Sequence, residues 1–357
     1  MKKILYITNS IDENNQLGYR HSSILNILRA SFEIDLIDFA FTKKKNNFVK
    51  KAINKIFKFP DLYRLFLFRY KRKIQSNIKQ NKYSSVVIGV LPHSFLYLAT
   101  FIKKINSQLK IIVDMTDPLS INVSYINCWL IYRLWIKWYE KKHLKSVDRL
   151  IVLNESIKLY YEKNYPFLEK IIVLEQGTNA YKNKLNISNN KRAKRLELVY
   201  AGMFYNNKLR EPFELYKAIE IFDLPIRLSI YGSFKKKFIP PKTERYYYGG
   251  LVSKEFIRNK INEFDIVVFI DNFYGMQVPG KILESLATNK PILFIYKNEL
   301  SPTLKYVQEY NGIFYSKNND GEIVNTLKII ARQERFYYKR DLTKYYWGNL
   351  IKESYFS

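Results

Sequence analysis

The chain has 357 residues, of which 47% are hydrophobic and 16% aromatic, so it is not a disordered protein and is long enough for two domains. It contains 60 lysines and arginines against 32 aspartates and glutamates, and the net charge of +28 favours an anionic partner such as nucleic acid, a lipid surface or a phosphorylated substrate. The single cysteine, Cys128, excludes an intrachain disulfide and a CxxC metal site, and three scattered histidines argue against a zinc enzyme.

The N-terminal segment MKKILYITNS predicts a buried strand. Its apolar run is too short for a signal peptide, and the polar residues Thr8, Asn9 and Ser10 follow it directly. No uncharged run elsewhere approaches the length needed to span a bilayer. We therefore expect the protein to be made and kept in the cytoplasm.

Short apolar runs, each followed by a loop and a helix-length segment, recur along the chain. They are rich in β-branched or aromatic residues and alternate only weakly, as expected of strands buried on both faces. They span 3–8, 33–39, 85–91, 110–117, 149–155 and 170–177 in the first half, and 196–202, 226–232, 245–251, 265–271 and 291–297 in the second. Strands that alternate with helices indicate βαβ units and parallel sheets.

A polar, basic stretch separates the two series of strands and defines the domains. We predict an N-terminal Rossmann-like domain over 1–182, a linker over 183–194, and a second Rossmann-like domain over 195–335. A terminal helix over 336–357, anchored by Trp347, should pack back toward the first domain. The expected fold class is α/β with two doubly wound parallel sheets, and the cleft between the domains is the expected ligand site.

Residues 43–80 are strongly basic, with Asp61 as their single acid. Over 48–58 the apolar residues gather on one side of a helix and the lysines on the other. This composition is typical of an amphipathic helix that lies on an anionic bilayer. We therefore expect 43–80 to hold the protein at the inner face of the cell membrane as a peripheral protein.

A second candidate for membrane contact is 128–143, where Trp129, Trp135 and Trp138 resemble interfacial anchors. For this segment we favour the alternative of an ordinary helix whose apolar face packs on the sheet. Nucleic acid is the rival anionic partner, but the sequence contains no helix-turn-helix, RNP, KH or zinc signature. We therefore expect no nucleic-acid partner.

The stretch VPGKILESLATNKPIL, residues 278–293, predicts a helix after a buried strand. Pro279 suits its first position, and Asn289 suits the left-handed position after its last turn. Lys281 and Glu284 share the polar face, and the helix N-terminus should point to the carboxyl-end crevice, where phosphate binds well. Taken alone, this polar face is more simply explained as a solvated surface.

The surrounding sequence favours a ligand-binding helix over a solvated surface. VPGKILESLATNKPIL resembles the P-x-K-x-x-E-(Y/S)-L-A-x-x-K-P-I signature of GT-B glycosyltransferases in the broad glycosyltransferase family 4. VYAGMFYNNKLREP is similar to the segment that opens that family's second domain, and VDMTDP, VDRLIVLNES and KIIVLEQGTN are similar to segments of its first domain. The resemblance covers most of the chain in order and implies a GT-B fold and a nucleotide-sugar donor.

The resemblance assigns a donor site to the second domain. The donor-binding set comprises Gly202, Arg210, Pro279, Gly280, Lys281 and Glu284. Lys281 and Arg210 would contact the diphosphate and stabilise the leaving nucleoside diphosphate. Glu284 would accept hydrogen bonds from the ribose. Gly202 would allow close approach of the backbone to the ligand.

The acceptor side is assigned to the first domain. Asp117 is the expected acid or base and joins Arg210 and Lys281 as a catalytic residue, with Asp114 as its rival, although a strand-ending aspartate also suits a turn. Gly18 matches the turn between the first strand and first helix. The other candidates are Arg20, which could bind phosphate or be an exposed surface arginine, and His93, which could touch substrate or make a structural hydrogen bond.

One position departs from the family pattern. Many members carry a glutamate eight residues before the ribose-binding glutamate, where this chain has Met276. The contacts to the donor sugar must therefore differ, and the identity of the sugar and the retention of its anomeric configuration stay open.

These observations together predict a metal-independent hexosyltransferase that needs no cofactor, and the resemblance favours the retaining type. Its acceptor would be a lipid-linked glycan at the cytoplasmic membrane face, in capsule, O-antigen or exopolysaccharide assembly. The alternatives are a GT-B nucleotide-sugar epimerase and a non-catalytic basic protein that binds anions or nucleic acid.

Overall fold

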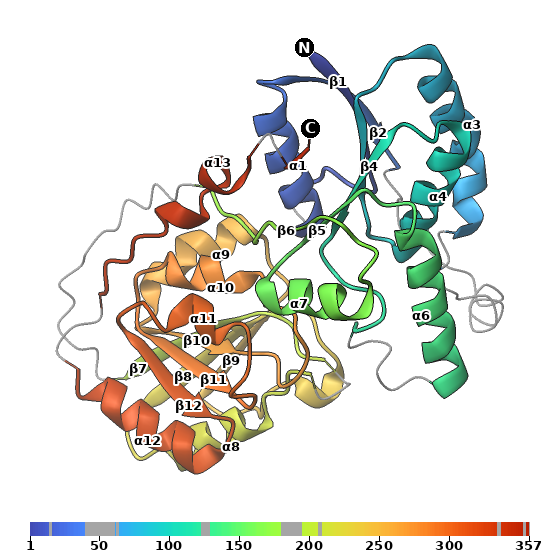
Figure 1. Cartoon of the computed structure of the whole chain (residues 1–357). Helices are drawn as coiled ribbons and strands as arrows, with labels where there is room; N and C mark the ends of the chain where they lie inside the picture. Colours follow the sequence, from blue (N-terminus) through green and yellow to red (C-terminus); the bar gives the residue numbers. More distant parts are fainter. Residues whose placement is uncertain are drawn as a thin grey trace. The chain divides into compact units, whose positions relative to one another are not determined.

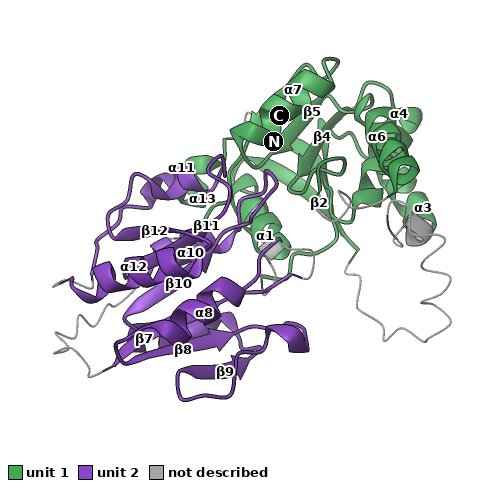
Figure 2. Ribbon diagram, turned by 90° about the horizontal axis from the view of Figure 1, so that it is seen from below, with its two compact units in different colours: residues 1–177, 345–357 green, residues 178–344 purple. Residues whose placement is uncertain are grey.

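The chain forms two compact units, each built on its own six-stranded parallel sheet, in the computed structural model. Unit 1 comprises 1–177 and 345–357, and unit 2 comprises 178–344 (Figure 2). The structure describes residues 1–13, 16–39, 61, 64–122, 129–179, 195–205, 209–333, 337–352 and 355–356. The proposed amphipathic helix at 48–58 lies outside the described residues, as does the rest of 43–60.

The sheet of unit 1 has the strand order β2-β1-β3-β4-β5-β6. Its strands are β1 (Lys2–Thr8), β2 (Phe32–Asp38), β3 (Ser85–Gly89), β4 (Lys110–Met115), β5 (Arg149–Val152) and β6 (Ile171–Val173). All pair in parallel, and β3 and β5 are buried along their whole length, as their continuous apolar runs predict. The order reverses between β1 and β3, so the unit is doubly wound.

Helices cover both faces of this sheet (Figure 1). They are α1 (Gln16–Leu28), α3 (Arg64–Gln80), α4 (Leu96–Ile105), α6 (Leu130–Leu144) and α7 (Glu155–Asn164). Ile24, Leu25 and Leu28 of α1 pack on one face with the end of the chain, whereas α4 contacts β3 and β4. Helix α6 packs on α4 and so belongs to an outer layer.

The prediction that 128–143 is an ordinary helix whose apolar face packs on the sheet is wrong for one of the two apolar faces of α6. Ile136, Tyr139 and Leu144 point inward and are buried. Trp135 and Trp138, in contrast, are each 57% exposed. The helix carries two apolar stripes, because residues at 131, 134, 135 and 138 repeat with the same helical spacing as those that face inward.

The end of the chain does not form the single helix predicted over 336–357. It contains a 3-10 turn at Thr343–Tyr345 and the short helix α13 (Trp347–Leu350). Trp347 is buried in the core of unit 1 and leaves no room for a side chain at Gly177. This segment therefore completes the sheet face that α1 also covers.

The sheet of unit 2 has the order β12-β11-β10-β7-β8-β9. Its strands are β7 (Leu196–Ala201), β8 (Ile226–Tyr231), β9 (Tyr246–Gly250), β10 (Ile266–Ile270), β11 (Ile292–Tyr296) and β12 (Ile313–Lys317). The apolar pattern predicts all of these except β12, an edge strand that pairs only with β11. The order reverses between β7 and β10, and ligands of such sheets bind at the carboxyl ends of strands at this point.

The helices of unit 2 are α8 (Phe213–Ile221), α9 (Lys254–Lys260), α10 (Lys281–Leu286), α11 (Leu304–Val307) and α12 (Asp320–Ala331). Apolar residues of α8 and α12 pack together against one face of the sheet and form the main core. Helices α9, α10 and α11 lie on the other face (Figure 1).

The stretch VPGKILESLATNKPIL forms helix α10, which is shorter than the helix predicted from the sequence. It begins at Lys281 with Gly280 as its N-cap, so Pro279 precedes the helix instead of opening it. Asn289 has a φ of 55°, the left-handed conformation that the sequence predicts for this position. Two residues, Lys290 and Pro291, lead from it to β11, and Pro291 prevents continuation of the helix.

Candidate functional site

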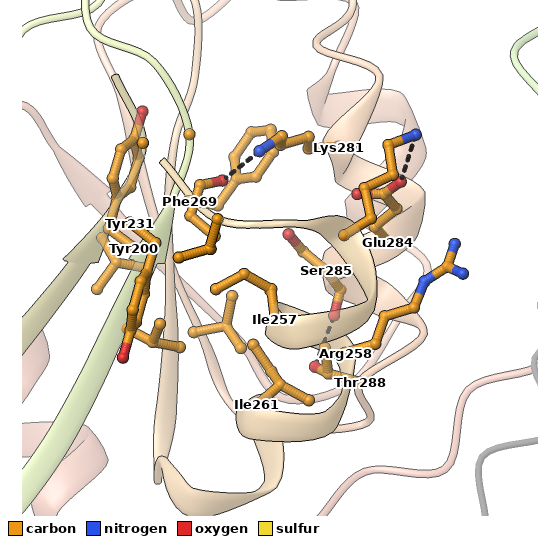
Figure 3. A pocket seen from close by; sticks show the side chains of 18 of the residues that line it. Tyr200, Tyr231, Ile257, Arg258, Ile261, Phe269, Lys281, Glu284, Ser285 and Thr288 are labelled. Atoms are coloured by element: carbon orange, nitrogen blue, oxygen red, sulfur yellow. Dashed lines mark hydrogen bonds and ion pairs between the residues drawn. The ribbon is translucent and has the colours of Figure 1, made fainter. Parts of the chain in front are cut away.

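A pocket opens in unit 2 at the carboxyl ends of β7, β8 and β10, beside α9 and α10 (Figure 3). Its cavity has a volume of about 150 Å³. Since one water needs roughly 10–15 Å³, the cavity accepts a group of several heavy atoms. It lies at the point where the strand order of the sheet reverses, as expected for a ligand site of this architecture.

The interior wall of the pocket is apolar. Val199, Val267 and Phe269 come from the sheet, and Ile257 and Ile261 come from α9 and the turn that follows it. Figure 3 shows these two isoleucines and Phe269 facing the same space. Such a wall suits a flat, weakly polar group such as a heterocyclic base.

Lys281 supplies a cation at the rim. Its Nζ donates a hydrogen bond of 2.9 Å to the carbonyl oxygen of Ala201, at the end of β7. Although the side chain as a whole is exposed, desolvation of the ammonium group lowers the pKa of Lys281, and the nearby charge of Glu284 opposes this shift. The ammonium group is thus held against a strand end and keeps donors for an anion.

Glu284 lies one helical turn after Lys281 on the same face of α10. Its carboxylate is half-buried and forms an ion pair of 3.9 Å with Lys254 at the start of α9. The pair joins the two helices across the mouth of the pocket (Figure 3). An exposed pair of this length adds little stability, so the carboxylate can exchange it for the hydroxyl groups of a ligand.

Arg210 lines the same pocket from the loop between β7 and α8. Its NH2 donates a hydrogen bond of 2.7 Å to Oδ1 of Asn272, and its guanidinium lies over the ring of Tyr205. Its Nε is buried and has no hydrogen-bond partner among the described residues. Because a buried donor without a partner is costly, this N–H favours an acceptor that enters the pocket.

Gly202 follows β7 and also lines the pocket. Its N–H donates to the carbonyl oxygen of Tyr231, so this amide is used within the sheet. A Cβ at Gly232 would lie 1.9 Å from the carbonyl oxygen of Gly202. The two glycines therefore allow the ends of β7 and β8 to approach closely.

Most of the donor residues expected from the sequence line one pocket, and the others do not. Gly202, Arg210, Lys281 and Glu284 line one pocket. Pro279 and Gly280 are not among its lining residues and serve to begin α10. Met276 is likewise outside the lining, in the loop between β10 and α10.

Sequence reasoning overlooked Asp271, which is buried at the end of β10. Its carboxylate accepts hydrogen bonds from the hydroxyl groups of Ser301 and Thr303, at 2.5 and 2.7 Å. Burial raises the pKa of Asp271, and these hydrogen bonds oppose the shift. Asp271 thereby fixes the loop that carries Asn272, the hydrogen-bond partner of Arg210. Its only signal in the sequence is its place at a strand end.

Two acceptor-side candidates form a buried ion pair in unit 1. Nε and NH2 of Arg20 donate to the two carboxylate oxygens of Asp114, each at 2.9 Å, and both side chains are 1% exposed. The guanidinium also donates to the carbonyl oxygens of Leu174 and Glu175. Arg20 is therefore neither an exposed arginine nor available to a phosphate, and Asp114 is not an available acid or base.

Gly18 lies in the first turn of α1, not in the loop before it as predicted. A Cβ there would be 2.1 Å from the carbonyl oxygen of Asp12, so the residue serves close packing of the helix on the preceding loop. His93 is buried and its Nε2 donates a hydrogen bond of 3.0 Å to the backbone oxygen of Asp117. Asp117 itself is half-buried in the loop after β4.

The described residues contain no group of three or more His, Cys, Asp or Glu side chains that could hold a metal ion. Among the helices described, none is long and apolar enough to cross a membrane.

Comparisons with known proteins identify the architecture. No protein-family model and no curated protein sequence matches the chain. Solved structures do match: a sucrose-phosphate synthase from Thermosynechococcus elongatus has 12% identity and a TM-score of 0.63, and the match covers 98% of this chain and 92% of that one. The lipopolysaccharide outer core galactosyltransferase WaaB has 15% identity and a TM-score of 0.64, with 96% and 95% covered.

A third structure, HepE from Anabaena in complex with UDP and glucose, has 11% identity and a TM-score of 0.62 over 98% of this chain and 93% of that one. At such identities the matches establish the fold alone. They extend over nearly the whole of each chain and agree with the two doubly wound sheets. The chain therefore has the GT-B fold of glycosyltransferases, as the sequence resemblance implies.

Proposed function

We propose that the protein is a glycosyltransferase that binds a nucleoside-diphosphate sugar in the pocket of unit 2. The observation that carries this proposal is the meeting of two cations, Lys281 and Arg210, with the carboxylate of Glu284 around one apolar wall. These groups match the base, the ribose and the diphosphate of such a donor. The GT-B fold of the solved neighbours supports the same reading.

In this arrangement the base lies against the apolar wall, next to Phe269, Ile257 and Ile261. Glu284 accepts hydrogen bonds from the ribose hydroxyl groups, as acidic residues do in other nucleotide sites. The diphosphate lies toward Lys281 and Arg210. The Nε–H of Arg210 has no partner among the described residues and can donate to a phosphate oxygen. Helix α10 has only six residues, so its dipole contributes little and the side-chain cations carry the charge.

The chemistry follows from this placement. During transfer, the bond between the anomeric carbon and the diphosphate oxygen breaks, its electron pair leaves with the nucleoside diphosphate, and the acceptor oxygen forms the new bond to the anomeric carbon. Lys281 and Arg210 stabilise the charge that develops on this leaving group. Because these cations can do what a divalent metal does elsewhere, we expect transfer to be unaffected by EDTA and to need no cofactor.

We assign the acceptor to unit 1, with Asp117 as the group that takes a proton from the acceptor hydroxyl. His93 holds the backbone of this residue by its hydrogen bond, so it is a positioning residue. Glu140 fixes the same loop further on, where it accepts from the backbone N–H groups of Leu119 and Ser120. Asp114 is excluded from this role by its pairing with Arg20.

The finer assignment is transfer of a hexose, with retention, to a lipid-linked glycan at the cytoplasmic face of the membrane, in capsule, O-antigen or exopolysaccharide assembly. Its support is the sequence resemblance and the fold shared with WaaB, a protein of lipopolysaccharide outer core synthesis. Met276, where many members of the family that the sequence resembles carry a glutamate, leaves the sugar to be identified by experiment.

The proposal is tested first by thermal unfolding in the presence of UDP-, GDP- and CMP-sugars, since a bound donor raises the unfolding midpoint. Release of sugar from the stabilising donor is then compared in Lys281→Ala and Glu284→Ala. Lys305→Ala and Glu244→Ala, at exposed positions of the same unit, are matched controls. Full activity in both pocket variants would refute the site, and an epimerised donor formed without any acceptor would identify an epimerase instead.

A further inference from the structure

The outer side of α6 exposes a stripe of large apolar side chains. Ile131, Leu134, Trp135 and Trp138 are 57 to 73% exposed and share one face, and Trp129 before the helix is 82% exposed. Monomeric proteins seldom leave such a contiguous set of large side chains in water, so the stripe marks an interaction surface.

The position of this stripe is fixed by the inner side of the same helix. The buried carboxylate of Glu140 accepts hydrogen bonds from the hydroxyl groups of Tyr161 and Tyr165, at 2.6 and 2.7 Å. Nδ1 of His143 is hydrogen-bonded to Thr100, at 2.8 Å. Rotation of α6 to bury its tryptophans would break these contacts, so the outward stripe is a stable feature of the folded unit.

The stripe continues into an apolar groove between α3, α4 and α6, with a cavity volume of about 370 Å³. Phe68 of α3, which is 64% exposed, lies on its border together with Trp135 and Trp138. Lys71 is held there by aromatic rings, because its Nζ lies over Phe68 and Tyr97 and donates a 2.8 Å hydrogen bond to the hydroxyl of Tyr97.

The charges around the stripe and groove are of one sign. Helix α3 contains no acid, and the only acid of α6, Glu140, is fully buried. The exposed basic residues of the two helices are Arg72, Lys73, Lys79, Arg133, Lys137, Lys141 and Lys142. No ion pair neutralises these side chains within the described part of the chain. Such a face is complementary to an anionic surface.

We propose that this α3–α6 face docks on an anionic lipid bilayer. The tryptophans and aliphatic side chains enter the boundary between headgroups and acyl chains, hydrocarbon occupies the groove, and the lysines contact lipid phosphates. A single-stranded nucleic acid would match the charge and the aromatic rings, but it would offer no apolar partner to the aliphatic side chains of Ile131 and Leu134. The face includes α3, which belongs to the basic segment 43–80 predicted to contact the membrane, and α6, which overlaps the second candidate segment 128–143.

The docking face would bring the protein to a lipid-linked acceptor. The test of docking needs neither donor nor acceptor, so the docking proposal can fail or succeed independently of the proposed activity. Binding of the full chain to sedimented vesicles is compared for phosphatidylcholine alone and for mixtures with phosphatidylglycerol. We expect binding only to the anionic vesicles. The variant Trp135→Ala/Trp138→Ala should lose at least about tenfold in partition coefficient.

Leu300→Ala, at a 90% exposed apolar residue of unit 2, is the control and should bind as the wild type does. Lys137→Gln/Lys141→Gln should bind more weakly and with less dependence on salt, whereas Lys235→Gln/Lys305→Gln, with the same change of net charge, should not. Circular dichroism and thermal unfolding confirm that each variant is folded, as expected for changes at exposed positions.

Tryptophan fluorescence gives a second readout. The chain has four tryptophans, and the variant Trp129→Phe/Trp347→Phe retains only Trp135 and Trp138. Brominated phosphatidylglycerol should quench their emission. Undiminished vesicle binding by Trp135→Ala/Trp138→Ala would overturn the proposal. So would equal binding to uncharged vesicles, quenching by single-stranded DNA in place of lipid, or a dimer in solution that the double variant abolishes.

Discussion

Lys281 is the residue whose chemistry the proposed function depends on most. Burial lowers its pKa below the ordinary value of 10.5, and Glu284 opposes that shift. Only the protonated ammonium group attracts a diphosphate, so UDP affinity should fall as the pH rises through this lowered pKa. Glu284→Gln removes the opposing charge, and the fall should then occur at a lower pH. Titration calorimetry at increasing alkaline pH measures both, and coincident pH profiles would contradict the coupling.

His21 makes a second prediction about a single residue, concerning stability. Its ring is fully buried beside Tyr6, at 2.8 Å from that hydroxyl, and burial lowers its pKa from 6.5 to about 4. Between these two values the unfolded chain takes up a proton that the folded chain does not. The free energy of unfolding should therefore drop by about 2 kcal/mol between pH 7 and pH 5 through this residue alone.

The check is chemical denaturation of wild type and His21→Asn at both pH values, with amide exchange of β1 reporting on unit 1. The variant is expected to be less stable at pH 7 but to lose less stability on acidification. An identical pH dependence in the two proteins would show that His21 does not set it.

Among single residues, sequence motifs located Lys281, Glu284, Arg210 and Gly202 in one pocket because their positions relative to strand ends are local features. The partnership of Arg20 with Asp114 joins positions 94 residues apart and has no local signal. Burial of both groups, which decides between ion pair and ligand site, is a property of the assembled sheet.

At the scale of elements, the segment after α10 is held by Arg340. Its guanidinium donates to the carbonyl oxygens of Leu286, Lys290, Asn311 and Gly312. The residue is 8% exposed, and burial lowers its pKa to about 10, which still leaves it charged at neutral pH. It closes the end of α10 against the start of β12, and so supports the helix that carries Lys281.

Arg340→Met should lower the free energy of unfolding of unit 2 by about 2–4 kcal/mol, because several carbonyl oxygens lose a charged donor. UDP affinity should fall as well, since α10 loses its support. Urea denaturation and calorimetry measure the two effects. Arg332→Met, at the exposed C-cap of α12, is the control, and a stability equal to wild type in Arg340→Met would refute the role.

Elements were predictable to different degrees. Runs buried on both faces, such as β3 and β10, have an unambiguous apolar signal. Strand β12 lies at an edge, and only one of its five residues is buried, so its pattern is weak. The prediction for α6 is wrong for one apolar stripe, because two stripes with the same helical spacing look alike in the sequence and only the packed structure shows which one is buried.

At the scale of the whole molecule, the chain folds into two units, each with its own sheet. The pocket is lined by residues of unit 2 alone. Hydrogen exchange with UDP should therefore show increased protection around the ends of β7 and β10 and in α9 and α10. Protection that appears first in unit 1 would place the nucleotide elsewhere.

The proposed donor site is tested most directly by the specificity of nucleotide binding. Calorimetry compares UDP, UMP and 2′,3′-dideoxy-UDP, or the analogues of whichever base the thermal screen selects, in wild type, Lys281→Ala and Glu284→Gln. Lys281→Ala should lose roughly 1.5–3 kcal/mol for the diphosphate and much less for the monophosphate. Glu284→Gln should reduce the discrimination against the dideoxy ligand. Equal losses for all three ligands in both variants, or no loss in either, would contradict the assignment of the diphosphate to Lys281 and the ribose to Glu284.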